Sequence, residues 1–316
     1  NWMGFTEGEK HDRMRGLVTR AFSTRIIRQL QPMIESIVDD LLDNVKRKDR
    51  FDFVHDIAFL LPATVICNLL GIEQDTHEEF RQWTQPIANF TGGVSDRLIQ
   101  IAEQARISYE HFQSYFRELT EKRRRAPRDD LISQLVNNDV DLTETELIGM
   151  CVFLFVAGYD TTLSMLTTGM MHLLTYRHQH EQLRRDSSLM DAMIEETLRF
   201  EPPVFWNTRL VAEDVVIRGC RIQKGQGILL HHGAANRDPD VFVKPDHFDI
   251  TRSDNRHLAF GYGTHFCLGA HLARLEGKVV FVKCLEQFPA IELDTDKTTW
   301  VPNAGLRCLA TLPVRI

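Results

Sequence analysis

One short run of residues most constrains how this chain can fold, because it places a cysteine between a glycine-rich turn and an apolar helical pattern. Residues 260–269 read Phe-Gly-Tyr-Gly-Thr-His-Phe-Cys-Leu-Gly, so the cysteine is Cys267. Gly261, Gly263 and Gly269 permit backbone conformations and close approaches that a side chain would block. Apolar residues then recur at spacings of four and three, which predicts one buried helix face. They are Leu268, Leu272, Leu275, Val279 and Val282.

The position of Cys267 suggests its chemistry. Free backbone N–H groups and the positive end of the helix dipole favour a thiolate over a thiol at a helix start. A thiolate in an apolar pocket cleared by glycines suits a flat iron macrocycle, which needs an axial ligand. Two other interpretations stay open for these residues alone. A single cysteine beside glycines is most often a buried small hydrophobe. His265 and His271 suggest zinc, although their spacing does not match paired zinc ligands.

A second unusual stretch interrupts a long apolar helix. Thr143 followed by Glu146 predicts a capping box at the helix start, and the apolar pattern continues to about Tyr176. In its middle, residues 157–162 read Ala-Gly-Tyr-Asp-Thr-Thr, which places an acid and two hydroxyls in what should be pure core. Threonines inside a helix can bond to the preceding turn and bend it. By itself the stretch is equally consistent with a kink whose polar residues face solvent.

A glutamate and an arginine form a third motif. Glu196 and Arg199 stand three apart on a predicted helix, and Pro202 and Pro203 end that helix. Such pairs are common and add only about 0.2–0.5 kcal/mol to helix stability, so the pair alone carries little information. Its place in the chain, between the long helix and the cysteine run, makes it informative.

Cations near the start of the chain form a fourth set. His11 and Arg15 share one face of a predicted helix, and Arg209 follows the double proline on an extended run. Such cations bind carboxylates through charge-assisted hydrogen bonds. The alternative is an ordinary solvated face, because further cations lie nearby at Lys10, Arg13 and Arg20.

Composition narrows the class of protein. The 316 residues, 43% hydrophobic and 26% charged, are typical of a globular protein with one large domain or two smaller ones. A net charge of −7 argues against a general nucleic-acid binder. Six scattered cysteines without framework spacing suit a reducing cytoplasm. No apolar run approaches the roughly twenty residues of a membrane span. The nearest candidate, 51–72, is interrupted by Asp56, Pro62 and Asn68.

The patterns along the chain are helical first and mixed later. Helical periodicity covers 9–22, 25–46, 57–70, 76–88 and 96–123, with a short helix at 129–137 before the long one. Short extended runs broken by glycines predict a small sheet within 204–230. An irregular stretch from Asn236 to the cysteine run follows, and such a length is often functional. Residues 299–315 predict a pair of strands with Gly305 near the turn. The fold class is therefore mainly α with small β-sheets (α+β).

The pattern Phe-Gly-x-Gly-x-His-x-Cys-x-Gly resembles the haem-binding loop of the cytochrome P-450 superfamily. The resemblance covers essentially the whole chain, in order, and is closest to soluble bacterial-type members. It implies a single cytochrome P-450 domain over 1–316, helix-rich over 1–200 and mixed over 201–316. In the family, a further stretch of sheet, helices and a substrate-covering loop precedes the helix that matches 1–15. We therefore expect the numbered residues to lack that N-terminal part.

The resemblance implies a haem b (iron protoporphyrin IX) cofactor. Cys267 would be the proximal iron ligand, with Phe260 packed near the sulfur and Gly261 and Gly269 in the surrounding loop. His265 would reach a haem propionate. Residues that match the family's other propionate ligands are His11, Arg15 and Arg209.

The 157–162 stretch resembles the acid–alcohol pair of the family's distal helix. Ala157 and Gly158 would leave room for dioxygen over the iron. Thr161 would hydrogen-bond the bound oxygen species, and Asp160 would link it to solvent protons. A substrate would bind on the same side. The resemblance places six apolar residues around it, although plain core packing is the alternative for each: Phe153, Val156, Val204, Phe205, Trp206 and Leu306.

Glu196 and Arg199 resemble the family's structural Glu-x-x-Arg signature. The third partner would come from residues 245–248, where many members carry arginine and this chain carries His247. How strongly His247 holds the pair depends on its charge, which varies near neutral pH.

The resemblance implies a haem-thiolate monooxygenase that inserts one oxygen atom from dioxygen into a small organic substrate, by hydroxylation or epoxidation. An external ferredoxin or flavodoxin-type donor would supply electrons, because no flavin or iron–sulfur motif is present. It would dock electrostatically at Lys10, Arg13 and Arg20. One alternative is a peroxide-driven peroxygenase of the same fold, which the Asp160–Thr161 pair argues against. The other is a non-catalytic haem-binding or recruiting module, favoured if the absence of the N-terminal part is natural.

Overall fold

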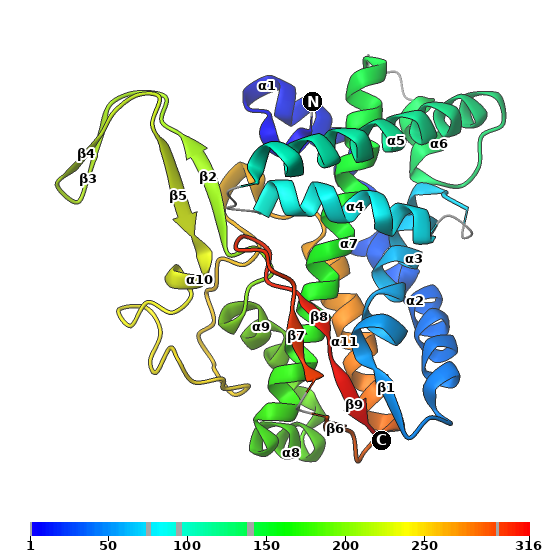
Figure 1. Cartoon of the computed structure of the whole chain (residues 1–316), viewed down its shortest axis with the longest axis vertical. Helices are drawn as coiled ribbons and strands as arrows, with labels where there is room; N and C mark the ends of the chain where they lie inside the picture. Colours follow the sequence, from blue (N-terminus) through cyan, green and yellow to red (C-terminus); the bar gives the residue numbers. More distant parts are fainter. Residues whose placement is uncertain (1, 74–76, 93–96, 138–141, 295–296) are drawn as a thin grey trace.

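The computed structural model describes residues 2–316 apart from 74–76, 93–96, 138–141 and 295–296. Helices packed around one central helix make up most of it, with small sheets at the edges (Figure 1). The longer helices are α1 (Gly8–Thr19), α2 (Thr24–Val45), α3 (Leu60–Leu70), α4 (His77–Gly92), α5 (Leu98–Arg125), α7 (Glu144–Thr175), α9 (Met190–Phe200) and α11 (Ala270–Gln287). The shorter helical elements are η1 (Met3–Phe5), η2 (Val54–Ala58), α6 (Leu131–Val136), α8 (Arg177–Arg185), η4 (Ser187–Leu189), α10 (His232–Ala235) and η5 (Gly263–His265).

The central helix, α7, begins with the predicted capping box. The Glu146 amide donates to the Thr143 hydroxyl at 3.3 Å, and the Thr143 amide donates to the Glu146 carboxylate at 3.1 Å. α7 contacts α3, α5, α9 and α11. Among the described residues it is the one helix long and apolar enough to cross a membrane, and 67% of that apolar window is buried inside the protein. The expectation that 51–72 is the nearest candidate span was therefore wrong, and the burial of α7 is that of a core helix.

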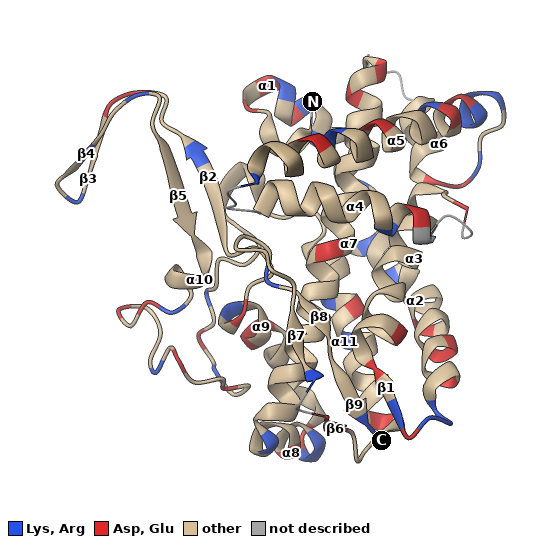
Figure 2. Ribbon diagram, in the orientation of Figure 1, with Lys and Arg blue, Asp and Glu red and all other residues tan. Residues whose placement is uncertain are grey.

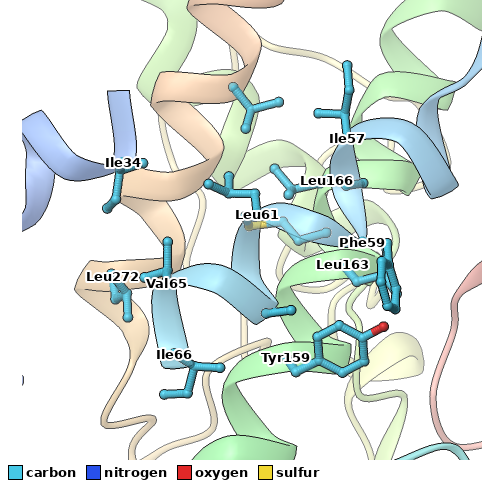
Figure 3. Packing of buried hydrophobic residues seen from close by; sticks show 14 of the residues in the cluster. Ile34, Ile57, Phe59, Leu61, Val65, Ile66, Tyr159, Leu163, Leu166 and Leu272 are labelled. Carbon is cyan, nitrogen blue, oxygen red and sulfur yellow. The ribbon is translucent and has the colours of Figure 1, made fainter. Parts of the chain in front are cut away.

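The hydrophobic core lies where α2, α3, α7 and α11 meet (Figure 3). Ile34 comes from α2, Val65 from α3, Leu166 from α7 and Leu272 from α11, and all four are buried. Burying a side chain of this size contributes about 1.5–3 kcal/mol. Because α11 packs against both α2 and α7, this core holds in place α11, the helix that follows Cys267.

Small antiparallel sheets lie around the helices. β1 (Arg50–Asp52), β9 (Pro313–Arg315) and β6 (Glu292–Leu293) form one sheet with β9 in the middle. β2 (Trp206–Leu210) pairs with β5 (Gly227–His231), and β3 (Val215–Ile217) pairs with β4 (Cys220–Ile222). These two pairs form a projecting arm (Figure 1) and confirm the sheet predicted within 204–230. β7 (Thr299–Trp300) pairs with β8 (Leu309–Thr311) as predicted, but β9 pairs with β1 and β6 instead.

The segment from Asn236 to Gly269 contains no strand and only the short η5, as its sequence predicts. It connects α10 to α11 and carries the cysteine run at its end. Regular secondary structure therefore does not set its path, and the contacts described below do.

Candidate functional site

The cysteine run forms a tight loop directly before α11. Gly261 and Gly263 have φ angles of 71° and 76°, in the left-handed region that favours glycine. The Cys267 amide donates to the Phe260 carbonyl at 2.8 Å, which closes the loop. α11 begins at Ala270, so the cysteine lies three residues before the helix.

Opposing influences act on the Cys267 thiol. Burial raises its pKa, and this outweighs the backbone hydrogen bonds from Gly269 and Ala270 and the positive charges of Arg15 and Arg274, which lower it. The backbone N–H groups at the helix start favour the thiolate as expected, and burial opposes them. A bound metal ion reverses the balance, since a coordinating thiol is deprotonated.

His265 contacts one carboxylate of the chain itself, and the charges of His11 and Arg209, two more of the predicted propionate-binding residues, favour the anionic form of that carboxylate. His265 Nε2 lies 3.1 Å from Glu7 Oε2, and the His265 and His11 ring centroids are 4.3 Å apart. The hydrogen bond with His265 lowers the pKa of Glu7, with smaller contributions from the charges of His265, Arg209 and His11, and together they exceed the effect of burial. The cluster therefore has the donors and the charge to hold a carboxylate.

Arg15, the fourth predicted cation, makes a different contact. Its Nη2 donates to the Phe266 carbonyl at 2.6 Å, which ties α1 to the cysteine loop. One turn earlier on α1, the buried His11 ring faces His265 of the same loop. The helix face predicted from the spacing of His11 and Arg15 therefore packs on the loop, and is not an ordinary solvated face.

One face of α7 is open although the rest of the helix is largely buried. Ala157 is exposed, while Phe153 and Thr161, four residues away on either side, are half-buried. This spacing places all three on one helix face. Thr161 Oγ1 donates to the Ala157 carbonyl at 2.7 Å, the bond to the preceding turn expected of threonine. The helix continues unbroken through this stretch, and a Cβ on Gly158 would meet Ile66 of α3 at 3.4 Å, so Gly158 faces the core rather than the opening.

Asp160 is half-buried as a residue, but its carboxyl atom Oδ2 is buried. Burial raises its pKa to about 7, and its Oδ2 has no hydrogen-bond partner among the described residues. A carboxyl group with a pKa near neutrality can both take up and release protons, as a proton relay requires.

The Glu196–Arg199 pair is fully buried and sets the path of the irregular segment. Arg199 Nε and Nη2 donate to the two Glu196 carboxylate oxygens, each at 2.8 Å. Arg199 also donates to three backbone carbonyls, those of Asn236, Pro245 and His247, at 2.8–3.0 Å. A helix pair that looked uninformative in isolation therefore holds three points of a chain segment that lacks secondary structure.

The third partner of this pair is Arg252, and the expectation that it is His247 was wrong. Arg252 Nε donates to Glu196 Oε2 at 3.1 Å, whereas His247 contributes its backbone carbonyl and its side chain is exposed. Arg252 follows His247 by five residues in the sequence. It reaches Glu196 because the chain after His247 turns back toward that carboxylate, which also accepts a hydrogen bond from the Asp249 amide at 2.8 Å. The sequence offers Arg252 as a cation downstream of the family position, but spacing alone does not select it.

The six predicted pocket residues occupy different surroundings. Val204 and Leu306 form an isolated β-bridge, which brings the double-proline segment to the terminal turn as predicted. Strand alternation places Phe205 on the opposite side from Val204 and Trp206. The Phe205 ring lies 5.6 Å from the His231 ring and lines a cavity of about 550 Å³ with Glu201, Arg237 and Arg307 among others.

The two pocket residues on α7 are also placed differently from each other. The Phe153 ring packs 5.7 Å from the Trp2 ring, at the edge of the open helix face. Val156 is buried and belongs to the hydrophobic core.

A second ion-pair group, absent from the sequence expectations, lies behind the cysteine loop. Arg274 on α11 donates to the Glu195 carboxylate on α9 through Nε at 2.6 Å and Nη2 at 2.8 Å. His257 Nε2 lies 3.1 Å from the same carboxylate. A glutamate next to the Glu-x-x-Arg signature and an arginine seven residues after Cys267 were the only signals in the sequence.

These residues fit an iron protoporphyrin. The donor set offers a cysteine sulfur near backbone N–H groups and two arginines, which suits a thiolate-ligated iron. His265 already holds one carboxylate, with the charges of His11 and Arg209 favouring it, which suits a propionate. Ala157 is an exposed small residue in the middle of a largely buried helix, which suits a flat ring and a small ligand beside it.

Comparisons with known proteins agree with this geometry. The family model described as Cytochrome P450 matches residues 3–306. The biotin biosynthesis cytochrome P450 of Bacillus subtilis is 36% identical to this chain. The match covers 99% of this chain and 79% of that protein. 6-Deoxyerythronolide B hydroxylase of Saccharopolyspora erythraea is 37% identical, with 78% of its length covered by 99% of this chain.

The solved structures show the same similarity. P450BioI, in complex with an acyl carrier protein ligated to hexadec-9Z-enoic acid, has a TM-score of 0.96 at 37% identity, covering 99% of this chain and 81% of that one. CYP267B1, in complex with myristic acid, has a TM-score of 0.92 at 40% identity. The match covers 98% of this chain and 77% of CYP267B1. Hydroxylases and monooxygenases among the relatives do not favour the peroxygenase or non-catalytic alternatives. This chain belongs to the cytochrome P450 family and is a haem b-binding monooxygenase that uses dioxygen, an organic substrate and electrons from a redox partner.

Proposed function

We propose that Cys267 supplies the thiolate ligand of the haem iron, and that His11, Arg15, Arg209 and His265 surround the propionates. The contact of His265 with the Glu7 carboxylate, next to the cysteine loop and with the charges of His11 and Arg209 favouring the same anion, carries this proposal. The bound haem supplies oxygen activation. Arg15 supports the ligand through its bond to Phe266 and through its charge, which favours the thiolate form of Cys267.

Protons reach the distal side through Asp160 and Thr161. The buried Asp160 carboxyl, with a pKa near 7, takes protons up and releases them at working pH. Thr161 lies on the open face of α7 next to Ala157, and its hydroxyl can turn from the Ala157 carbonyl to a ligand on that face.

The substrate is apolar and is held between α7 and the Val204–Leu306 bridge. The half-buried Phe153 on one side and the bridge on the other support an apolar enclosure. The relatives are consistent with this, since structures with myristic acid, testosterone and an acyl carrier protein bearing a fatty acid are among them. A fatty-acyl or polyketide-like chain is therefore the first substrate class to test.

A ferredoxin or flavodoxin delivers the electrons. Of the three cations expected to form its docking surface, two lie against an acidic residue. Lys10 and Arg13 both lie against Glu146, at 3.4 and 2.8 Å, so part of their charge is compensated within the protein. Arg20 is exposed at the end of α1. Both acidic and basic residues occur on the outer helices in the view of Figure 2, so a small group of cations, rather than a strongly basic face, guides the donor. Charge reversal at Arg20 should slow reduction by an acidic ferredoxin at low salt, and an unchanged rate would exclude it.

We place the protein in the cytoplasm. All six cysteines are free, as a reducing compartment would keep them, and the relatives are bacterial.

The spectrum of the reduced carbon monoxide complex tests the iron-ligand proposal. Thiolate ligation gives a strongly red-shifted Soret band, which should disappear in Cys267→Ser. Cys220→Ser is the matched control, because Cys220 is exposed on the projecting arm. A red-shifted band that survives in Cys267→Ser, or is missing from the unmutated protein, would refute the proposal. Binding of fatty acids and macrolides to the same samples, followed by the low-spin to high-spin shift, tests the substrate class.

A further inference from the structure

An ion pair links α9 to α11 directly behind the cysteine loop. The planar Arg274 guanidinium donates two hydrogen bonds to the Glu195 carboxylate, at 2.6 and 2.8 Å. His257 adds a third contact at 3.1 Å. Burial raises the pKa of Glu195, but the bonds and charges of Arg274 and His257 outweigh it and bring the pKa to about 2. Glu195 is therefore an anion at neutral pH, and the guanidinium is held in one orientation.

The position of the guanidinium connects this pair to the cysteine. Arg274 lies over the Phe260 ring, 4.5 Å from its centroid. The backbone carbonyl of Phe260 accepts the Cys267 amide. Arg274 is also one of two arginines whose charge favours the Cys267 thiolate, the other being Arg15. A fixed positive charge thus lies against the ring of Phe260, the residue whose carbonyl closes the cysteine loop.

A second ion pair between the same helices provides a comparison. Lys278 Nζ lies 2.8 Å from Asp191, one turn further along α11. Its two side chains are 49% and 71% exposed, against 33% and 28% for Arg274 and Glu195. Exposed pairs of this kind contribute little because solvent screens them. The Arg274 pair is more buried, is bidentate, and has the Phe260 ring against it. The Lys278 pair links the same two helices without these features, so linking α9 to α11 does not by itself require them.

We propose that Arg274, oriented by Glu195, is a positioning residue that raises the reduction potential of the iron bound by Cys267. Reduction of ferric to ferrous iron adds one electron from the donor and neither forms nor breaks a bond at Arg274. The added negative charge is stabilised by a nearby fixed cation, and this interaction is strong where solvent is partly excluded. The inference rests on the proposed role of Cys267 as the iron ligand.

A spectroelectrochemical titration of the haem-loaded protein tests the proposal. In Arg274→Gln, the ratio of ferrous to ferric haem at a fixed applied potential should fall on the order of tenfold. Glu195→Gln should raise the ratio, because the anion is lost while the cation stays. Arg274→Lys keeps the charge but loses the bidentate bonds, so its ratio of ferrous to ferric haem should lie between those of Arg274→Gln and the unmutated protein. Lys278→Gln, the matched control on the same helix, should leave the ratio within about twofold of the unmutated protein.

The outcomes separate the inference from the proposed function. If the unmutated carbon monoxide complex lacks the red-shifted Soret band, the ligand assignment fails. If the band is present but Arg274→Gln and Lys278→Gln shift the potential equally, or neither shifts it, the inference fails alone. If Arg274→Gln slows only electron transfer from a protein donor and leaves the potential unchanged, Arg274 is a docking residue and the proposal is overturned. Should Arg274→Gln not fold, the opposite signs expected for Arg274→Lys and Glu195→Gln still decide the question.

Discussion

Replacing Arg252 by methionine should destabilise the protein far more than replacing His247 by alanine. Arg252 donates to the fully buried Glu196 carboxylate at 3.1 Å and to the Val243 carbonyl at 2.9 Å. A hydrogen bond to a charged group contributes about 1.5–3 kcal/mol. Glu196 keeps Arg199 as a counter-charge in Arg252→Met, so the free energy of unfolding should fall by about 1.5–3 kcal/mol. The full cost of breaking a buried ion pair, about 3–5 kcal/mol, is expected for Arg199→Met instead.

His247→Ala is the matched control, because its exposed side chain has no part in the cluster and its carbonyl remains in place. Surface changes of this kind stay within about 0.5 kcal/mol. Urea unfolding of the haem-loaded proteins, followed by far-ultraviolet circular dichroism, measures the three free energies, with an unchanged m-value as the check on comparability. If His247→Ala costs as much as Arg252→Met, the assignment of Arg252 as the third partner is refuted.

Three further outcomes are expected. Gly261→Ala should cost about 1–2 kcal/mol because φ is 71° there, whereas Gly269→Ala, at φ −83°, should cost little, and equal losses in thermal unfolding would contradict this. Burial raises the pKa of Glu276 from 4.5 to about 8, and its Oε2 has no hydrogen-bond partner in the described part of the chain. The stability that its neutral form contributes is therefore full below pH 4.5 and is lost as the pH rises through 8. The advantage of Glu276→Gln over the unmutated protein should therefore grow, on the order of a few kcal/mol, between pH 5 and pH 8.5, and a constant difference in urea unfolding would count against it. Thr161→Ala should leave the haem spectrum unchanged and lower the product formed per dioxygen consumed, whereas Thr161→Ser, which keeps the hydroxyl, should restore it; equal losses in both variants would argue against the proton role.

The sequence predicts the fold well where local patterns decide it. The capping box at Thr143, the apolar periodicity of α11 and the irregular stretch after Asn236 all appear where their residues predict them. The pairing of β9 with β1 and β6 was missed, because strands of two or three residues carry no periodicity and their partners lie far apart in the chain.

Some residues of the candidate site could be predicted from the sequence, and others only the folded structure shows. Residues inside a compact motif, such as Cys267 with its glycines, could be singled out because the whole motif resembles that of a known family. Arg252 could not, because the segment that brings it to Glu196 has no regular structure and its path depends on contacts across more than fifty residues. The raised pKa of the Cys267 thiol was likewise hidden, since burial is a property of the assembled core.

The three carbonyls held by Arg199 also have a consequence for the order in which the chain folds. A coil without strands gains little from local bonds, so the chain entropy lost on ordering it must be offset by contacts with residues outside it, among which Arg199 makes three. Those three contacts exist once α9 has packed and Glu196 and Arg199 are in place. The cysteine loop at the far end of the coil should therefore take its shape late, and the cofactor should meet a chain whose helical core is already built. Pulse-labelling of backbone amides during refolding would show protection in α7 and α9 before protection of the Cys267 amide.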